Sequence, residues 1–357
     1  MRCWTMRLLA MAVGVLALPY RAPAPLIYTP GEGWRYEKVG EEKKWMRTRA
    51  KEQLDVAQEA FDHQDYALAL KAAKRTVTQW PFSDYAPQAQ YLQARCLEAK
   101  GDDQGAFKQY QNLLQKYAKA SNYAEVLDRQ FAIANKYLNG KSYRLWGYIP
   151  IGASMVKTVE MYDKIIKNGP YSDCAPQAQL NIGAAEEKKK VLWIKAPEYP
   201  AAAKAYERAA DRYADRERVA AEALFKAGLA YEKQAMKAEY DQSIAGQAIN
   251  TFSDFTVLHP EDPRVVEAQK LVAAMKTEQA RGSFMTAKYY EKRHRWRGAA
   301  IYYNDVLRKD PESKFAAEAR TRLVDINRRI EADPTVPVAA PKTPAASKTP
   351  ASEGGQK

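Results

Sequence analysis

The chain has 357 residues, enough for about two domains or one long repeat array. Lys and Arg total 56 against 43 Asp and Glu, a net charge of +13, and 46% of the residues are hydrophobic. This composition is ordinary for a globular protein and excludes bulk disorder and a polytopic membrane protein. The cysteines, Cys3, Cys96 and Cys174, form no CxxC pair, so neither a disulfide scaffold nor a metal staple is predicted.

The first predicted element is a signal peptide over residues 1–24. An apolar run at residues 8–18 follows two arginines and is too short to span about 30 Å of hydrocarbon. Ala22 and Ala24 form an A-x-A cleavage pattern, although Pro25 directly after it suits the cleavage site poorly. A buried N-terminal helix is the alternative, but prolines end the run at once. The sequence therefore predicts export.

The rest of the chain divides by composition into four parts. Residues 25–46 are rich in turn-forming residues and contain two tryptophans, which predicts an extended strap. Helical modules are expected over 47–216 and 217–330. Residues 331–357 contain mainly Pro, Ala, Thr, Ser and Lys without an aromatic residue, so a disordered tail is predicted there.

The central region repeats itself. The segments Pro81–Gln90 and Pro170–Gln179 are identical at eight of ten positions, and weaker copies begin at Pro260 and Pro311. Amphipathic segments with helical spacing precede the prolines, and no convincing strand is visible. The repeating unit is therefore predicted to be a pair of helices.

These spacings resemble the tetratricopeptide repeat, a helical hairpin of 34 residues. Small residues at fixed positions would let paired helices approach, and aromatic residues would fill the grooves between hairpins. The predicted fold is all-α, a tetratricopeptide-like superhelix of five or six helical hairpins, one of them with a longer loop between its helices. The frames fall near 50–83, 87–120, 127–172, 176–216, 221–262 and 280–313.

Three segments resemble a more specific family. They are Trp80–Tyr85, Thr251–Phe255 and Ala287–Arg293. Over about residues 47–330 the chain resembles the outer-membrane protein assembly lipoprotein family BamD, also called YfiO. The resemblance implies a non-catalytic scaffold of the β-barrel assembly machinery, located in the periplasm and peripheral to the outer membrane. Its implied partners are unfolded β-barrel proteins and the periplasmic domains of a BamA-like insertase.

Two features depart from the family pattern. No cysteine stands at a lipobox, because Cys3 precedes the apolar run, so membrane association is expected through partners rather than a lipid anchor. This favours an alternative function, a periplasmic repeat scaffold for cell-envelope division or peptidoglycan synthesis. The second departure is an aromatic insertion at 139–154, either a plug folded onto the array or a finger that binds a partner.

No catalytic, metal or cofactor site is predicted. His63, His259 and His294 lie far apart, without a neighbouring His or CxxC at ligand spacing. Nucleophile and nucleotide-binding motifs are missing too, and no strands are predicted to support them. Cys96 and Cys174 are interpreted as buried thiols, with a disulfide as the alternative.

The basic charge is densest near residues 288–297. An exported repeat protein without a base-stacking motif is not expected to bind nucleic acid. Acidic protein or lipid headgroups are the remaining partners, and a merely solubilising face is the alternative. Helical spacing places four residues on one face, predicted to dock the insertase, namely Arg281, Phe284, Lys288 and Lys292.

If the chain functions as the resemblance implies, the first helices of the first three hairpins are expected to bind its clients, the unfolded β-barrel proteins. Positions outside the repeat consensus should line a concave groove that holds an aromatic side chain and a free carboxylate at the end of a barrel strand. The alternative is that the aromatic members pack between hairpins. The predicted groove residues are Gln58, Phe61, Tyr91, Arg95, Phe131 and Asn135.

Overall fold

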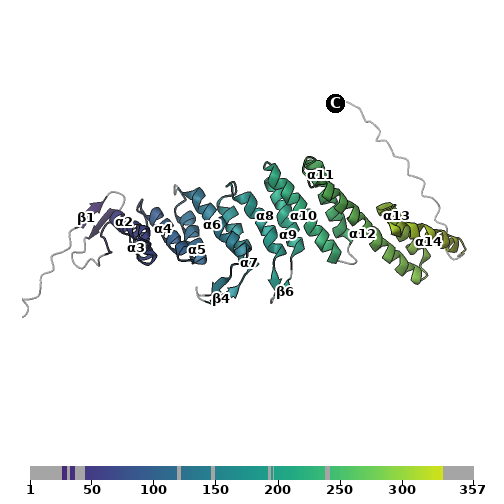
Figure 1. Cartoon of the computed structure of the whole chain (residues 1–357), viewed down its shortest axis with the longest axis horizontal. Helices are drawn as coiled ribbons and strands as arrows, with labels where there is room; N and C mark the ends of the chain where they lie inside the picture. The colour runs from purple at the N-terminus through teal and green to yellow at the C-terminus, as the bar shows by residue number, and fades with distance from the viewer. Residues whose placement is uncertain are drawn as a thin grey trace, which may run out of the picture. The chain divides into compact units, whose positions relative to one another are not determined.

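The computed structural model describes residues 26–29, 33–36, 45–118, 122–145, 149–191, 194–195, 197–237 and 242–332. The predicted signal peptide and nearly all of the predicted tail lie outside these residues. Thirteen α-helices form most of the described chain (Figure 1), which confirms the predicted all-α repeat fold. The chain divides into two compact units, residues 1–209 and 210–357.

The first unit is built from successive helical pairs. Helices that follow each other in the chain pack side by side, because each has one apolar stripe that only a neighbour can cover. The pairs are α2 (Ala50–Asp62) with α3 (Tyr66–Gln79), α4 (Ala86–Ala99) with α5 (Asp103–Lys116), α6 (Tyr123–Leu138) with α7 (Met155–Asn168), and α8 (Ala175–Glu187) with α9 (Tyr199–Arg212), which contains the boundary between the units.

The second unit continues the pattern with longer helices. Its pairs are α10 (Glu217–Lys237) with α11 (Gln242–Leu258) and α12 (Val265–Lys292) with α13 (Trp296–Lys309), followed by α14 (Lys314–Glu331). The prediction of a longer loop, which the sequence placed in the hairpin near 221–262, is wrong, because the additional residues extend α10 to 21 residues. Similarly, α12 begins 15 residues before the predicted frame at 280.

Short antiparallel strand pairs were not predicted from the sequence, yet the described residues contain three. The first, β1 (Leu26–Thr29) with β2 (Gly33–Tyr36), lies within the segment expected to be an extended strap. The others are β3 (Tyr143–Leu145) with β4 (Ile149–Gly152), and β5 (Lys190–Val191) with β6 (Ile194–Lys195). Each pair joins strands that are close in the sequence and lies outside the helices, so the helical architecture is unchanged.

The predicted aromatic insertion contains the β3–β4 hairpin, which projects from the helices of the first unit (Figure 1). Tyr143 at its base is buried, with its ring stacked 4.2 Å from that of Tyr137 and its hydroxyl 3.2 Å from that of Thr158. Ile149 and Ile151 on the second strand are exposed. The base of the insertion thus packs onto the array while its second strand faces solvent; residues 146–148 lie outside the described part.

The duplicated ten-residue segment is a helix start. Its central alanine opens α4 in the first copy and α8 in the second, each with proline at the next position, where a missing N–H costs nothing. The last residue of each copy, Gln90 or Gln179, donates to the partner helix of the same hairpin. Gln90 reaches the Gln109 side chain at 2.8 Å and Gln179 the Ala205 carbonyl at 3.3 Å.

Further buried amides join successive hairpins of the first unit. Gln93 of α4 donates to the Ala73 carbonyl of α3, and Gln130 of α6 donates to the Phe107 carbonyl of α5, both at 3.4 Å. A buried amide is costly unless it is hydrogen-bonded. These side chains therefore fix how each helix is placed along its neighbour.

Paired helices approach each other closely at small residues, as the repeat pattern predicts. A Cβ atom added at Gly228 of α10 would lie 2.5 Å from the nearest ring carbon of Phe252 in α11. A Cβ atom added at Gly183 of α8 would likewise clash with a ring carbon of Tyr206 in α9. Phe252 and Tyr206 are buried. The repeat positions that carry glycine and an aromatic residue are thus the packing positions of the fold.

Candidate functional site

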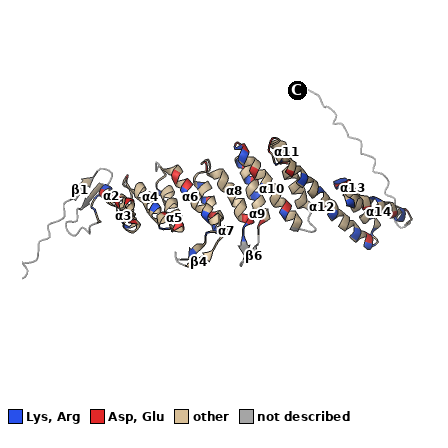
Figure 2. Ribbon diagram, in the orientation of Figure 1, with Lys and Arg blue, Asp and Glu red and all other residues tan. Residues whose placement is uncertain are grey.

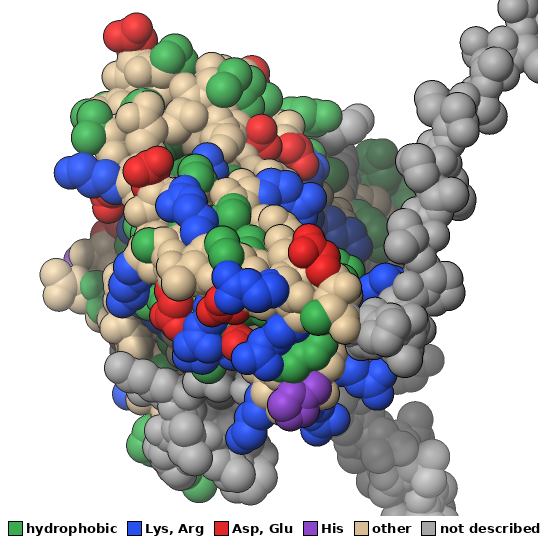
Figure 3. Space-filling view, turned by 90° about the vertical axis from the view of Figure 1, so that its right-hand side faces the viewer, with side chains coloured by type: hydrophobic (Ala, Val, Ile, Leu, Met, Phe, Trp, Pro, Cys, Tyr) green, Lys and Arg blue, Asp and Glu red, His purple; other side chains and the backbone are tan. Residues whose placement is uncertain are grey.

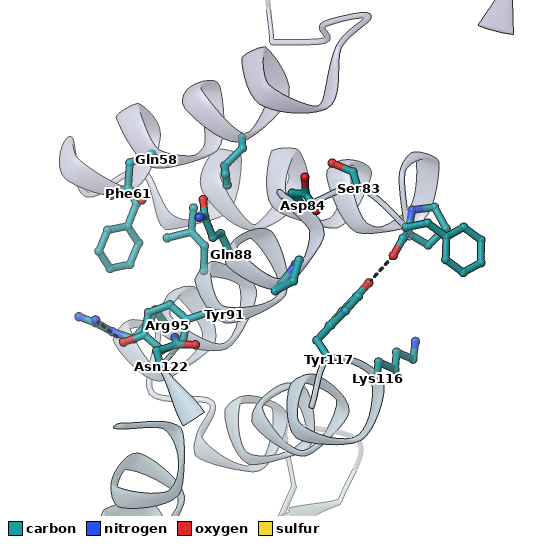
Figure 4. A pocket seen from close by; sticks show the side chains of 15 residues that line it. Gln58, Phe61, Ser83, Asp84, Gln88, Tyr91, Arg95, Lys116, Tyr117 and Asn122 are labelled. Carbon is teal, nitrogen blue, oxygen red and sulfur yellow. Dashed lines mark hydrogen bonds between the residues drawn. The ribbon is translucent and has the colours of Figure 1, made fainter. Parts of the chain in front are cut away.

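The first two hairpins enclose a pocket of about 820 Å³ (Figure 4). It contains four of the six residues predicted for client binding, Gln58 and Phe61 from α2 with Tyr91 and Arg95 from α4. Spacings of three and four residues put each pair on one face of its helix, directed at the same space. The other lining residues include Leu54, Phe82, Ser83, Asp84, Gln88, Lys116, Tyr117 and Asn122.

Arg95 is the central polar group of the pocket. Its guanidinium carbon lies 5.5 Å from the ring centre of Phe61 and 5.8 Å from that of Tyr91, a cation–π arrangement (Figure 4). One terminal nitrogen donates to the Tyr91 hydroxyl at 3.1 Å. Within the described part of the chain Arg95 forms no ion pair, so the fork retains donors that can bind a carboxylate.

Tyr91 connects the pocket to a charged network behind it. Its hydroxyl donates to Glu125 and accepts from Arg129 at 3.1 Å. The hydrogen bond from Tyr91, with the nearby Arg129, holds the pKa of Glu125 below its usual value. Arg129 also contacts Glu98, which accepts the Tyr110 hydroxyl at 2.8 Å. This network fixes the orientation of Tyr91 and therefore supports Arg95.

Two aromatic residues at the pocket were not predicted. Tyr117, after α5, donates from its hydroxyl to the Pro81 carbonyl at 3.0 Å and closes one side (Figure 4). Phe82 is 93% exposed, and its counterpart in the duplicated segment, Tyr171, is 91% exposed. The signal available in the sequence was that this position stays aromatic in both copies although the helix start does not require it.

The remaining two predicted groove residues do not line this pocket. Phe131 is half-buried and its ring centre lies 6.0 Å from that of Tyr162. The Asn135 side chain accepts from the Tyr162 hydroxyl at 2.6 Å and from Asn181 at 2.9 Å. Both residues thus pack or bond between helices α6, α7 and α8, as the alternative interpretation expected for Phe131.

The predicted docking face lies on α12 in the second unit. Lys288 and Lys292 are exposed, and Arg281 forms a two-pronged ion pair with Glu278. Lys288 is 4.0 Å from Glu318 of α14. Basic and acidic side chains alternate over α12 to α14 (Figure 2), and basic side chains gather on the end face that carries α13 and α14 (Figure 3).

The prediction that Phe284 belongs to that docking face is wrong. Its side chain is only 4% exposed and its ring packs 5.6 Å from Tyr303 and 5.5 Å from Phe315, between ring centres. Lys288 lies over the same ring at 5.3 Å. Phe284 therefore faces the core, and the exposed members of the predicted face are Lys288 and Lys292.

The histidines and cysteines of the described residues do not line the pocket of the first two hairpins. No three His, Cys, Asp or Glu residues of the described ranges are placed to hold a metal ion. His63 bonds the Glu59 carbonyl through Nδ1, and His294 lies edge-on to Trp296. Cys96 and Cys174 are buried and not paired with each other, and burial raises the pKa of both thiols.

These helical hairpins and their pocket define a tetratricopeptide-repeat scaffold for protein interactions. Residues 54–124, which form the pocket, match the tetratricopeptide repeat family. Residues 152–336 match the YfiO family, described as an outer membrane lipoprotein. That match spans just over half of the chain, so the protein belongs to the YfiO family, which confirms the resemblance seen in its sequence. It is a protein-interaction scaffold in outer-membrane assembly, and such scaffold families are generally not enzymes.

The solved structures that match this chain do so at low sequence identity and low TM-score. The C-terminal part of a TPR repeat-containing protein from Cytophaga hutchinsonii is 16% identical, with 76% of this chain and 87% of that chain covered at a TM-score of 0.32. Pseudomonas aeruginosa pilF is 12% identical, with 76% of this chain and 97% of that chain covered at a TM-score of 0.25. PilW, described as a type IV pilus biogenesis factor, is 15% identical, with 78% of this chain and 100% of that chain covered at a TM-score of 0.24. No curated protein matches the chain.

Proposed function

We propose that the pocket binds the C-terminal segment of unfolded outer-membrane β-barrel proteins. The observation that carries this proposal is the Arg95 fork, held between the rings of Phe61 and Tyr91 in a space of about 820 Å³. A barrel strand that ends in an aromatic residue and a free carboxylate offers the complementary groups. The carboxylate would bind Arg95, and the aromatic side chain would pack against Phe61 or Phe82.

The test uses two peptides that differ only at their C-terminus, one with a free carboxylate and one with an amide. A charge-assisted hydrogen bond contributes about 1.5–3 kcal/mol, so the wild-type chain should prefer the acid about ten- to hundredfold in fluorescence anisotropy. Arg95→Gln should weaken binding of the acid peptide to the level of the amide peptide and leave binding of the amide peptide unchanged. Thermal unfolding should change little, since Arg95 lies in the pocket and not in the core.

Arg129→Gln is the matched control. It removes the other guanidinium that bonds the Tyr91 hydroxyl, but Arg129 does not line the pocket. Loss of the contact with Tyr91 can weaken both peptides alike, but Arg95 is retained, so the variant should still bind the acid more tightly than the amide. An acid preference that survives Arg95→Gln would refute carboxylate recognition by this residue.

We further propose that the exposed lysines of α12 dock a BamA-like insertase through an acidic periplasmic domain, so that the protein associates with the membrane through this partner. Charges at the rim of an interface act mainly on the association rate and its salt dependence. Lys288→Glu with Lys292→Glu should therefore weaken a pull-down most at low salt. Lys270→Glu with Lys276→Glu, two exposed positions of the same helix, reverses the same charge and should have no such effect. Equal losses in the two double variants would refute docking at this face.

A further inference from the structure

A second pocket of the first unit, separate from the client pocket, lies between α5 and α7. It has a volume of about 360 Å³, and three lysines line it, Lys108 from α5 with Lys157 and Lys164 from α7. All three are exposed, and within the described ranges none forms an ion pair. Glu160 is its one lining carboxylate. The pocket is therefore a cationic recess suited to an anionic group.

The walls of this pocket are ordered by contacts that do not use the lysine charges. Gln111 and Asn168 exchange side-chain hydrogen bonds at 2.8 and 3.3 Å and join α5 to α7. Tyr143 is buried against Tyr137, and the Lys157 ammonium lies 5.2 Å from the centre of the Tyr143 ring. Lys157 is thus held over a fixed surface, and all three lysines are exposed to solvent.

An apolar edge adjoins the cationic pocket. Ile149 and Ile151 of β4 are 51% and 45% exposed, and Val156 in the first turn of α7 is 55% exposed. The edge is continuous with the pocket, because Tyr143 of β3 lines the pocket and pairs with Gly152 of β4, and Val156 precedes Lys157. Three exposed branched aliphatic side chains beside three unpaired lysines form an amphipathic surface.

We propose that this surface, composed of Ile149, Ile151, Val156, Lys108, Lys157 and Lys164, docks onto an anionic phospholipid leaflet. Exposed aliphatic side chains enter the boundary between headgroups and acyl chains, while lysines beside them attract lipid phosphates. Both kinds of group are present here, on the β3–β4 hairpin and the helices beside it. An acidic protein surface would match the lysines but would leave the aliphatic edge unexplained. The contact is made by this chain itself and does not depend on the insertase or on the client pocket.

The test is flotation of the full chain with vesicles of phosphatidylglycerol and phosphatidylcholine, compared with phosphatidylcholine alone. Wild type should float with the anionic vesicles and less so as salt is raised. Lys157→Gln with Lys164→Gln should reduce the partition coefficient about twenty-fivefold, which is about fivefold for each lysine near an anionic surface. Ile149→Ser with Ile151→Ser should reduce it at least fivefold without any change of charge.

Matched controls separate this surface from the general positive charge of the chain. Lys270→Gln with Lys276→Gln removes two exposed lysines of α12, and Val257→Ser removes an exposed aliphatic side chain of α11. Both should float like wild type. Equal losses in the two lysine double variants, or full binding by the isoleucine variant, would overturn the proposal. Failure of wild type to bind anionic vesicles would also overturn it and would leave an acidic protein as the ligand of the lysines.

Discussion

Replacing Gly228 by alanine sets two effects of opposite sign against each other. Alanine in a helix interior is favoured over glycine by about 1 kcal/mol. However, the new Cβ would lie 2.5, 2.7 and 2.8 Å from three ring carbons of Phe252, closer than any ordinary contact. Phe252 is fully buried and its ring meets Phe225 edge-on at 5.8 Å, so it cannot move away freely. Overpacking of this kind costs about 1–3 kcal/mol.

The net expectation for Gly228→Ala is a loss of about 1 kcal/mol in the free energy of unfolding, once the helix preference is subtracted from the upper part of the overpacking range. Urea unfolding followed by circular dichroism measures the loss. Hydrogen exchange of peptides from α10 and α11 should localise it. Phe252→Leu in the same chain should relieve the clash, so the double variant should be more stable than the sum of the single changes predicts.

Gly246→Ala is the matched control, since it makes the same change inside α11 of the same unit. The nearest atom to the added Cβ is the Gln279 amide nitrogen at 3.4 Å, an ordinary contact. This variant should gain up to about 1 kcal/mol. If Gly228→Ala proves as stable as Gly246→Ala, the contact with Phe252 does not limit helix approach and the packing argument fails.

Three further outcomes follow from burial and charge. Asp262 accepts two hydrogen bonds from the Arg264 guanidinium, which lower the pKa of Asp262 to about 2. Since this pKa is below its value in the unfolded chain, the ion pair stabilises the fold above about pH 4, and this stabilisation is lost as the pH falls toward 2. Asp262→Asn should therefore lower stability by about 1–2 kcal/mol at neutral pH in urea unfolding, and an equal loss near pH 3 would contradict this. Burial raises the pKa of Cys96 to about 11, so at about pH 8 a thiol reagent should modify it only after denaturation; rapid modification of the folded chain would show that the thiol is accessible. Tyr143→Ala should cost about 3 kcal/mol in thermal unfolding, and an unchanged melting temperature would show that this ring does not anchor β3.

The repeat fold was predictable because its determinants are periodic and local. Prolines open or precede helices α4, α8, α12 and α14, and small and aromatic residues alternate at helical spacing, as at Ala299 and Tyr303, both fully buried. The strand pairs were missed because each depends on very few residues. In β3, for example, strand pairing accompanies burial of Tyr143 against Tyr137, and no periodic pattern in the sequence predicts this contact.

The candidate site was predictable in part for a related reason. Helical spacing correctly grouped Tyr91 with Arg95, and pairing of neighbouring hairpins brought Phe61 to them. The same spacing cannot tell which side of a helix meets its neighbour. Phe284 was therefore assigned to a docking face although it packs in the core, since the difference depends on the tertiary contact with Tyr303.

The buried amides of α4 have a consequence for how this scaffold can change its ligand. Gln90 and Gln93 bond to the helices on either side, so sliding α4 by one turn, about 5.4 Å, would leave buried amides unpaired at about 1–3 kcal/mol each. Tyr91 and Arg95 lie on the remaining face of this helix, directed into the pocket. Residues that hold the helix and residues that meet the ligand thus occupy different faces of the same turns. Substitutions on the pocket face can therefore alter which peptide ends are accepted while the helix keeps its place in the array.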